Sequence, residues 1–425
     1  MKNYAAAENV GDETRNKAAA PRVCLLSETF YPVVGGGETH ARLLADRLNS
    51  KGTPVFALTR RSSREFPSME KIDNTTVFRV PPSGMKRFGK YFMTAFVLRE
   101  LFRRRRDYDL IFVCGYRVLG AAAVLAARRL NKACVLRAEA LGEMSGGYAS
   151  AYKRLPPVIG PIFRSWIRMR NRLLVQADGF VSISQPIKDE FIEQGADPNR
   201  VFTAPNGIDT RLFSPVSSSE KSALRKILSL PADAVIVSYS GKLNQGKGLE
   251  YLLDAWKSLA ASRQNLHLLL IGSGGGQALS CEEKLRAYVS EHGLSKLVTF
   301  TGYVENVQEY LQSSDLFVFP SENEALGISL IEAMSCGLPA VASRTGGIPE
   351  VVQHMDNGIL IEPGSSDAIV EAVSHLLDEH DLARELAQRA RETACTRFSM
   401  ETVAEQYADF FSSIMRKREA NRIDS

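Results

Sequence analysis

The sequence predicts two α/β domains, each built on a doubly wound parallel sheet. Strand-like apolar segments alternate with helical segments through both halves of the chain, a pattern typical of parallel α/β sheets. Turn-forming residues cluster between about 205 and 225, where the alternation stops and then restarts. A chain of 425 residues is long enough for two such domains.

The first half is expected to form six strands with helices between them. Glycines 35–37 form a turn after the first strand, and the helix that follows places Leu43, Leu44 and Leu48 on one side. We assign residues 21–208 to this domain. Residues 1–20 carry charges throughout and lack the apolar core of a signal peptide, so we expect a disordered tail there. The expected strands are Arg22–Ser27, Pro54–Thr59, Thr76–Val80, Leu110–Cys114, Ala133–Arg137 and Gly179–Ser184.

The second half repeats the alternation and is assigned to residues 209–395. An amphipathic helix at residues 399–416 closes the chain, so residues 396–425 are expected to form a C-terminal helical segment. The expected strands of the second half are Ala234–Ser240, Leu266–Ile271, Leu297–Phe300, Leu316–Pro320 and Ala340–Ala342.

Composition excludes disorder and fibrous structure, because 44% hydrophobic and 24% charged residues are ordinary for a globular protein. The six cysteines are scattered without a C-x-x-C pair, and the six histidines show no metal spacing. We therefore expect reduced thiols and no metal site. The longest apolar run, Val118–Ala127, is too short to span a bilayer.

Basic residues gather in two stretches, Lys86–Arg106 and Tyr152–Arg172. Together these stretches carry a net charge of +13, whereas the whole chain carries +5. One interpretation is a pair of helices, each with an apolar core face and a solvated basic face. The other is a surface for anionic lipid or a lipid-linked acceptor. The aromatic residues fall at helical spacing and are not interleaved as stacking platforms, so no nucleic acid partner is expected. These aromatic residues are Phe92, Phe96, Phe102, Phe163 and Trp166.

The segment at residues 316–350 carries the strongest functional signal. It reads as strand, loop, helix, strand and loop, with the helix at about 327–335. Glu332 falls on a helix that is too apolar for a surface position, and ligand hydroxyls would satisfy its carboxylate. Glu324 precedes the helix, where backbone N–H groups and the helix dipole favour an anion. The alternative is a capping box between Ser321 and Glu324, with Glu332 on a solvent face.

Two glycine-rich turns follow predicted strands. One carries Lys242 and Lys247, which can converge on a single anion although the turn does not match a P-loop. A solvated loop is the alternative for this turn. The other turn is at residues 35–37, where the glycines allow a backbone to approach a ligand closely or simply form a strand–helix turn.

The segment from Glu324 to Pro339 resembles the E-x7-E segment of the retaining glycosyltransferases of family 4. In it, seven residues separate Glu324 from Glu332, and Gly337-Leu338-Pro339 follows. Pro205-Asn206-Gly207-Ile208-Asp209 and the turn with Lys247 are similar to further segments of that family. The resemblance extends over nearly all of residues 22–415. It implies the GT-B fold, in which two Rossmann-like domains face a cleft and the last helix returns to the first domain.

The resemblance also implies roles for individual residues. Glu332 would bind the ribose of a nucleotide sugar, and Glu324 would face the donor sugar as a catalytic residue. Lys247 and Lys242 would balance the charge of the leaving diphosphate, although the family often has arginine where Lys242 stands. The remaining donor-binding positions implied are Leu326, Gly327 and Ile328 at the diphosphate, Gly36 and Gly37 in the cleft, and Tyr303 near the base.

The chain departs from the family pattern after the strand at 133–137. Many members have a histidine near the reacting sugar, and Glu139 stands at that position here. Strand ends face the ligand crevice in open α/β sheets, so we expect Arg137 and Glu139 near the cleft. Glu139 either contacts donor or acceptor hydroxyls or forms a local ion pair with Arg137.

The resemblance leads us to expect metal-independent transfer of a hexosyl unit, with retention, from a nucleotide-diphosphate sugar to a glycan or lipid-linked acceptor. No cofactor is expected. The enzyme is expected in the cytoplasm, at the inner membrane surface if the basic stretches bind lipid. The alternatives are another GT-B nucleotide-sugar enzyme such as a 2-epimerase, and a non-catalytic relative that serves as a partner subunit.

Overall fold

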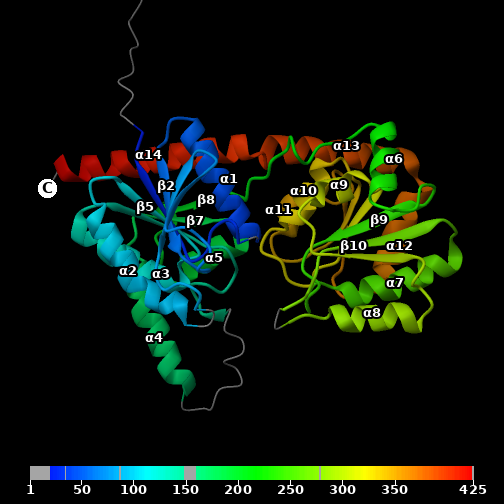
Figure 1. Cartoon of the computed structure of the whole chain (residues 1–425), viewed down its shortest axis with the longest axis horizontal. Helices are drawn as coiled ribbons and strands as arrows, with labels where there is room; N and C mark the ends of the chain where they lie inside the picture. Colours follow the sequence, from blue (N-terminus) through cyan, green and yellow to red (C-terminus); the bar gives the residue numbers. More distant parts are fainter. Residues whose placement is uncertain (1–19, 34, 86–87, 148–158, 277–278, 424–425) are drawn as a thin grey trace, which may run out of the picture.

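The structure is a computed structural model that describes residues 20–33, 35–85, 88–147, 159–276 and 279–423. It contains two α/β domains side by side, each with one sheet covered by helices (Figure 1). Every predicted strand forms, with ends that differ by at most two residues. The expected tail lies outside the described residues apart from Ala20.

The first sheet has eight strands in the order β3-β4-β2-β1-β5-β6-β7-β8, and all neighbours are parallel except β3 and β4. Its strands are β1 Val23–Ser27, β2 Val55–Arg60, β3 Met69–Ile72, β4 Thr75–Val80, β5 Leu110–Cys114, β6 Ala133–Arg137, β7 Gly179–Ser182 and β8 Val201–Thr203. Its helices are α1 Gly36–Ser50, α2 Gly89–Arg103, α3 Tyr116–Leu130, α4 Ile159–Leu174 and α5 Gln185–Glu193.

Helices cover both faces of this sheet, because alternate residues of each strand are buried on opposite sides. In β1, Cys24 and Leu26 join the apolar cluster that contains residues of α2, α3 and α5. Val23 and Leu25 instead join a second cluster with residues of α1 and of α14 (Met400–Ile423). The C-terminal helix is therefore part of the core of the first domain.

The second sheet is parallel, with the order β11-β10-β9-β12-β13-β14. Its strands are β9 Val235–Ser240, β10 Leu266–Ile271, β11 Val298–Gly302, β12 Leu316–Phe319, β13 Ala340–Ser343 and β14 Ile359–Ile361. Its helices are α6 Ser218–Ile227, α7 Leu249–Ser262, α8 Glu282–Glu291, α9 Val307–Gln312, α10 Ile328–Ser335, α11 Ile348–Val351, α12 Ser366–Asp378 and α13 His380–Arg397.

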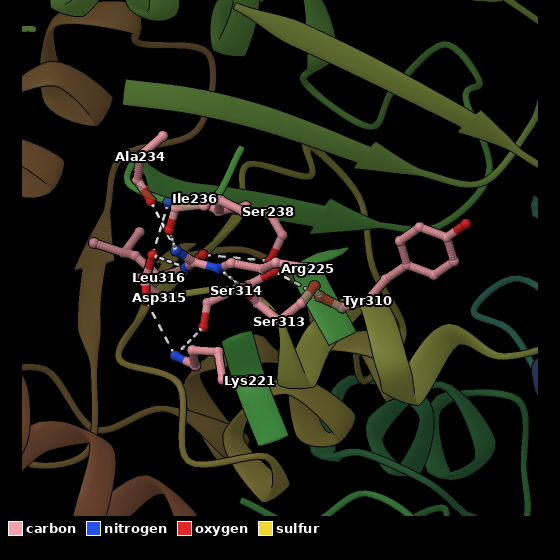
Figure 2. A network of polar contacts seen from close by, with 11 residues as sticks. Lys221, Arg225, Ala234, Ile236, Ser238, Tyr310, Ser313, Ser314, Asp315 and Leu316 are labelled. Carbon is pink, nitrogen blue, oxygen red and sulfur yellow. Dashed lines mark hydrogen bonds and ion pairs between the residues drawn. The ribbon is translucent and has the colours of Figure 1, made fainter. Parts of the chain in front are cut away.

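Helix α6 begins inside the segment that the sequence suggested as a linker. A capping box starts it, with the Glu220 N–H donating to Ser217 Oγ over 3.3 Å and the Ser217 N–H donating to Glu220 Oε2 over 2.8 Å. The buried Arg225 then fastens the helix to the second sheet through Asp315, at 2.5 Å (Figure 2). Helix α6 therefore packs with the second domain.

Asp315 connects this helix to a strand, as Figure 2 shows. Its Oδ2 also accepts the backbone N–H of Ile236 in β9 over 2.8 Å, and Lys221 lies 3.1 Å from its other oxygen. Arg225 additionally donates to the carbonyl of Ser313 over 2.9 Å. A buried guanidinium needs such partners, so this network fixes α6 against β9.

The chain crosses between the domains twice, and the two crossings pair with each other. The N–H of Ile208 donates to the carbonyl of Phe398 over 2.9 Å, and the N–H of Met400 donates to the carbonyl of Ile208 over 2.9 Å. Helix α14 then runs along the first domain, where Arg47 binds Glu401 over 2.9 Å. The return of the last helix to the first domain, implied by the family resemblance, is present.

The basic stretches differ from the first interpretation of their sequence. On α2 the buried side chains are Met93, Val97 and Leu101, whereas Phe92, Phe96 and Phe102 are exposed by 59%, 37% and 40%. The phenylalanines therefore do not form a core face. On α4 Ile167 and Leu174 are buried, and Trp166 is 45% exposed. Residues 86–87 and 148–158 lie outside the described residues.

Candidate functional site

A cavity of about 550 Å³ lies between the two domains, at the carboxyl ends of strands from both sheets. Ligands bind at this position in open α/β sheets. The first domain contributes the turn at 35–37 and the segment after β6, and the second contributes the segments after β9, β10 and β12. Of the predicted site residues, the cavity is lined by Gly36, Gly37, Arg137, Glu139, Lys242, Lys247, Tyr303, Glu324, Leu326, Gly327 and Ile328.

The loop between β12 and α10 supplies a helix N-terminus to the cavity. Helix α10 begins at Ile328, and its N-cap is Gly327 with φ 92°, a left-handed conformation that favours glycine. The alternative capping box is absent, because Ser321 Oγ is buried and has no hydrogen-bond partner in the described part of the chain. The first N–H groups of a helix lack partners within it, so those beside the cavity can bind an anion.

A second helix N-terminus approaches from the other domain. Helix α1 begins at Gly36, and a Cβ on this residue would lie 2.8 Å from Cδ1 of Ile328. Glycine at position 36 therefore allows the close approach of the two domains. Two helix N-termini, each with partial positive charge, border the same cavity.

The two predicted lysines differ in their surroundings. Lys247 Nζ donates to Glu324 Oε2 over 2.6 Å, and both side chains are largely shielded from water. Lys242 is exposed and forms no ion pair among the described residues. Lys247 is therefore held in place by Glu324, whereas Lys242 is an exposed cation at the cavity wall that can meet an entering anion.

Glu332 lies one turn further along α10 than Ile328 and does not line the cavity. It is half-buried, and its carboxyl group has no hydrogen bond or ion pair with any described residue. Burial raises its pKa to about 8. The structure therefore places this predicted ribose ligand beside the cavity, with an unsatisfied carboxyl group.

The ion pair between Arg137 and Glu139 is present, although it is long. Arg137 Nη1 and Glu139 Oε1 are 3.5 Å apart, and the arginine is fully buried. Burial raises the pKa of Glu139, and so do Glu38 and Glu28, while Arg137 and Arg117 lower it. Glu139 retains 34% exposure and faces the cavity, so the ion pair and a ligand contact are compatible.

Several lining residues were not predicted as ligands. Most follow the carboxyl end of a strand, which is a signal that the sequence does contain. Residues 344–350 do not line the cavity. They support the neighbouring loop, because the N–H of Gly347 donates to the carbonyl of Glu324 over 3.2 Å. Gly35, from the predicted glycine turn, also lines the cavity. The additional lining residues are Ile183, Asn206, Tyr239, Ser240, Gly241, Ile271, Gly272, Ser273, Val304, Val307, Phe319, Ala325 and Ser329.

Metal and membrane signals are absent from the described residues. None of their histidine, cysteine, aspartate and glutamate side chains form a group of three or more that could hold a metal ion. No helix in the same part of the chain combines the length and the apolar character needed to cross a membrane.

Comparison with known proteins agrees with this architecture. Residues 34–212 match Glycosyltransferase Family 4, and residues 220–393 match Glycosyl transferases group 1. The chain is 25% identical to the N-acetyl-alpha-D-glucosaminyl L-malate synthase of Bacillus anthracis over 93% of this chain and 98% of that protein. It is 26% identical to the D-inositol 3-phosphate glycosyltransferase of Geodermatophilus obscurus over 88% of this chain and 86% of that protein.

Solved structures share the fold. The sucrose-phosphate synthase of Thermosynechococcus elongatus superposes with a TM-score of 0.78 at 24% identity, over 93% of this chain and all of that one. Anabaena HepE in complex with UDP and glucose superposes with a TM-score of 0.73 at 22% identity, over 92% of this chain and all of that one. The chain therefore belongs to the group 1, family 4 glycosyltransferases and is an enzyme with the GT-B fold.

Proposed function

We propose that the protein transfers a hexosyl unit, with retention, from a nucleotide-diphosphate sugar to a glycan or lipid-linked acceptor, without a metal ion. The observation that carries this proposal is the convergence of Lys242, the Lys247–Glu324 pair and the N-terminus of α10 on one interdomain cavity. The solved complex of HepE with UDP and glucose, which shares the fold, supports a nucleotide-sugar donor.

The donor half of the cavity has the charge that this reaction requires. Cleavage of the bond between sugar and diphosphate increases the negative charge on the leaving group, and fixed cations and helix N-termini stabilise that charge. Lys247 is held for this purpose by Glu324, and Lys242 adds a second cation at the same wall. These groups supply the charge that a metal ion supplies in other transferases.

The acceptor half belongs to the first domain, where Glu139 faces the cavity. An ionised carboxylate accepts hydrogen bonds from sugar hydroxyls, and we assign this role to Glu139. Glu139→Gln removes the charge and keeps the shape. We expect it to raise the KM for the acceptor, and unchanged turnover and substrate affinity would rule this role out.

We further propose that α2 binds the inner surface of an anionic membrane, where a lipid-linked acceptor would be found. Phe92 and Phe96 are exposed on this helix, beside the exposed Arg99 and Arg103. Exposed aromatic groups next to cations are typical of interfacial helices. We expect wild-type protein to float with vesicles of phosphatidylglycerol and not with phosphatidylcholine, and absence of binding to both would reject the proposal.

The donor is tested by thermal melting with a panel of UDP-, GDP- and ADP-sugars in the presence of EDTA. A bound donor raises the melting temperature by mass action. Lys242→Ala should remove the shift, and Lys257→Ala, which alters an exposed lysine of α7 away from the cavity, should keep it. No shift with any nucleotide sugar would instead favour the non-catalytic relative.

The reaction class and its stereochemistry are tested together by proton NMR of the products. Retention predicts that the α-linked sugar of the donor gives an α-linked product. Conversion of the nucleotide sugar into an epimer without any acceptor would favour the 2-epimerase alternative. An inverted product would support glycosyl transfer and refute the proposed retention.

A further inference from the structure

Arg137 stands at the junction between the cavity and both interdomain crossings. Its guanidinium is fully buried and has partners in three separate segments. Nε donates to Tyr407 Oη of α14 over 3.1 Å, Nη2 donates to Asn206 Oδ1, and Nη1 lies 3.5 Å from Glu139 Oε1. Asn206 precedes the first crossing and Tyr407 follows the second.

The segments around Arg137 are tightly joined. The crossings are paired with each other through Ile208 and Met400, and a Cβ on Gly207 would lie 3.0 Å from Cα of Met400. His40 Nδ1 accepts the N–H of Gly207 over 3.1 Å. Burial and the Arg137 guanidinium lower the pKa of His40 well below its usual value, and its Nδ1 is the acceptor in this hydrogen bond, as in a neutral imidazole.

We infer that Arg137 is a positioning residue that holds Glu139 at the cavity wall and links it to the two crossings. This inference rests on the proposed function, in which Glu139 contacts the acceptor. One planar guanidinium binds all three segments, so the hydrogen bonds to Asn206 and Tyr407, which both lie in the first domain, fix the direction in which Arg137 reaches Glu139. The position of the acceptor carboxylate then depends on these two partners, which flank the interdomain crossings.

Tyr407→Phe is the decisive variant, because Tyr407 is buried, does not line the cavity and loses a single hydroxyl group. Tyr108→Phe is the matched control. Tyr108 is equally buried in the same domain, and its hydroxyl donates to the carbonyl of Leu101 over 3.0 Å, away from Arg137. Both variants lose one buried hydrogen bond, so both should lower the melting temperature slightly.

Hydrogen exchange of the ligand-free protein, followed by mass spectrometry, supplies the first measurement. In Tyr407→Phe we expect amide exchange in residues 138–143 to be about five- to tenfold faster than in the wild type. Tyr108→Phe should leave this segment unchanged. Equal exchange of residues 138–143 in the two variants would overturn the inference.

A double-mutant cycle separates positioning from general stability. If Tyr407 acts through Arg137 on Glu139, Tyr407→Phe adds no further exchange in residues 138–143 when Glu139 is already Gln. Additive effects of the two substitutions would show that Tyr407 stabilises the domain independently, and would overturn the inference.

Release of UDP from UDP-glucose in water supplies a catalytic measurement. Arg137 bonds to Tyr407, Asn206 and Glu139, and water replaces the acceptor in this assay, so Tyr407→Phe should leave both kcat and the KM for UDP-glucose within twofold. A rise in KM with unchanged kcat would contradict a positioning role. If the wild type neither binds nor turns over any nucleotide sugar, the proposed function fails, and hydrogen exchange still decides the role of Arg137.

Discussion

Glu332→Gln should stabilise the ligand-free protein at high pH and leave it unchanged at low pH. The carboxyl group of Glu332 lies on α10 between the buried Ile331 and Ala333, with no hydrogen bond to any described residue. Burial disfavours the charged form and raises its pKa from 4.5 to about 8. Glutamine has nearly the same shape and does not titrate.

The sign and size of the effect follow from this shift. Between pH 4.5 and 8 the folded protein keeps a proton that the unfolded chain has released, so rising pH across this window favours unfolding. The whole shift corresponds to about 5 kcal/mol at about 1.4 kcal/mol per pH unit. Because the side chain retains partial contact with water, we expect about 2 kcal/mol at pH 9.

The assay compares the melting temperatures of the wild type and the variant at pH 5, 7 and 9. Glu371→Gln is the matched control, since Glu371 is an exposed glutamate on α12 of the same domain. We expect the Glu332→Gln difference to grow from near zero at pH 5, while the control stays flat. A difference that is the same at all three pH values would refute the reasoning.

Three further substitutions test the cavity and the second domain. Lys247→Ala should lower turnover by about 10²–10³-fold with little change in melting temperature, and more than about a tenth of wild-type UDP release would contradict its role. Gly36→Val should weaken donor binding about tenfold in calorimetry, because its Cβ would meet Ile328 at 2.8 Å; unchanged affinity would show that the domains separate easily. Asp315→Ala should cost about 2–3 kcal/mol of stability, measured by thermal melting, because Arg225 remains buried without its carboxylate, and an unchanged melting temperature would contradict this.

The sheet order could be predicted in outline because buried parallel strands read as apolar runs. β5, β6 and β10 have their predicted ends for this reason. β3 was not predicted, because this antiparallel edge strand, MEKI, has two adjacent charged residues between two apolar ones and no buried residue. β8 and β14 have three residues each, too few for a periodic signal.

The meeting of several residues of the second domain at one cavity could be predicted because these residues follow strand ends. Lys242, Lys247 and Glu324 come from two loops that the parallel topology brings to one edge. The ion pair between Lys247 and Glu324 could not be predicted, since it joins residues 77 positions apart. The hydrogen bond between Arg137 and Asn206 could not be predicted either, because the sequence around Asn206 indicates only a turn.

Helix α2 shows why periodicity alone could not decide its orientation. Met93 and Val97 repeat every four residues, and so do Phe92 and Phe96, so the apolar arc covers two adjacent stripes. Large aromatic side chains are usually expected in a core. Here Met93 and Val97 pack against the domain instead, and Phe92 and Phe96 are exposed. The apolar surface of α2 is therefore wider than the part that packs against the domain, and arginines border the exposed part. This combination leads us to expect a partner that is both apolar and negatively charged, as an anionic membrane surface is.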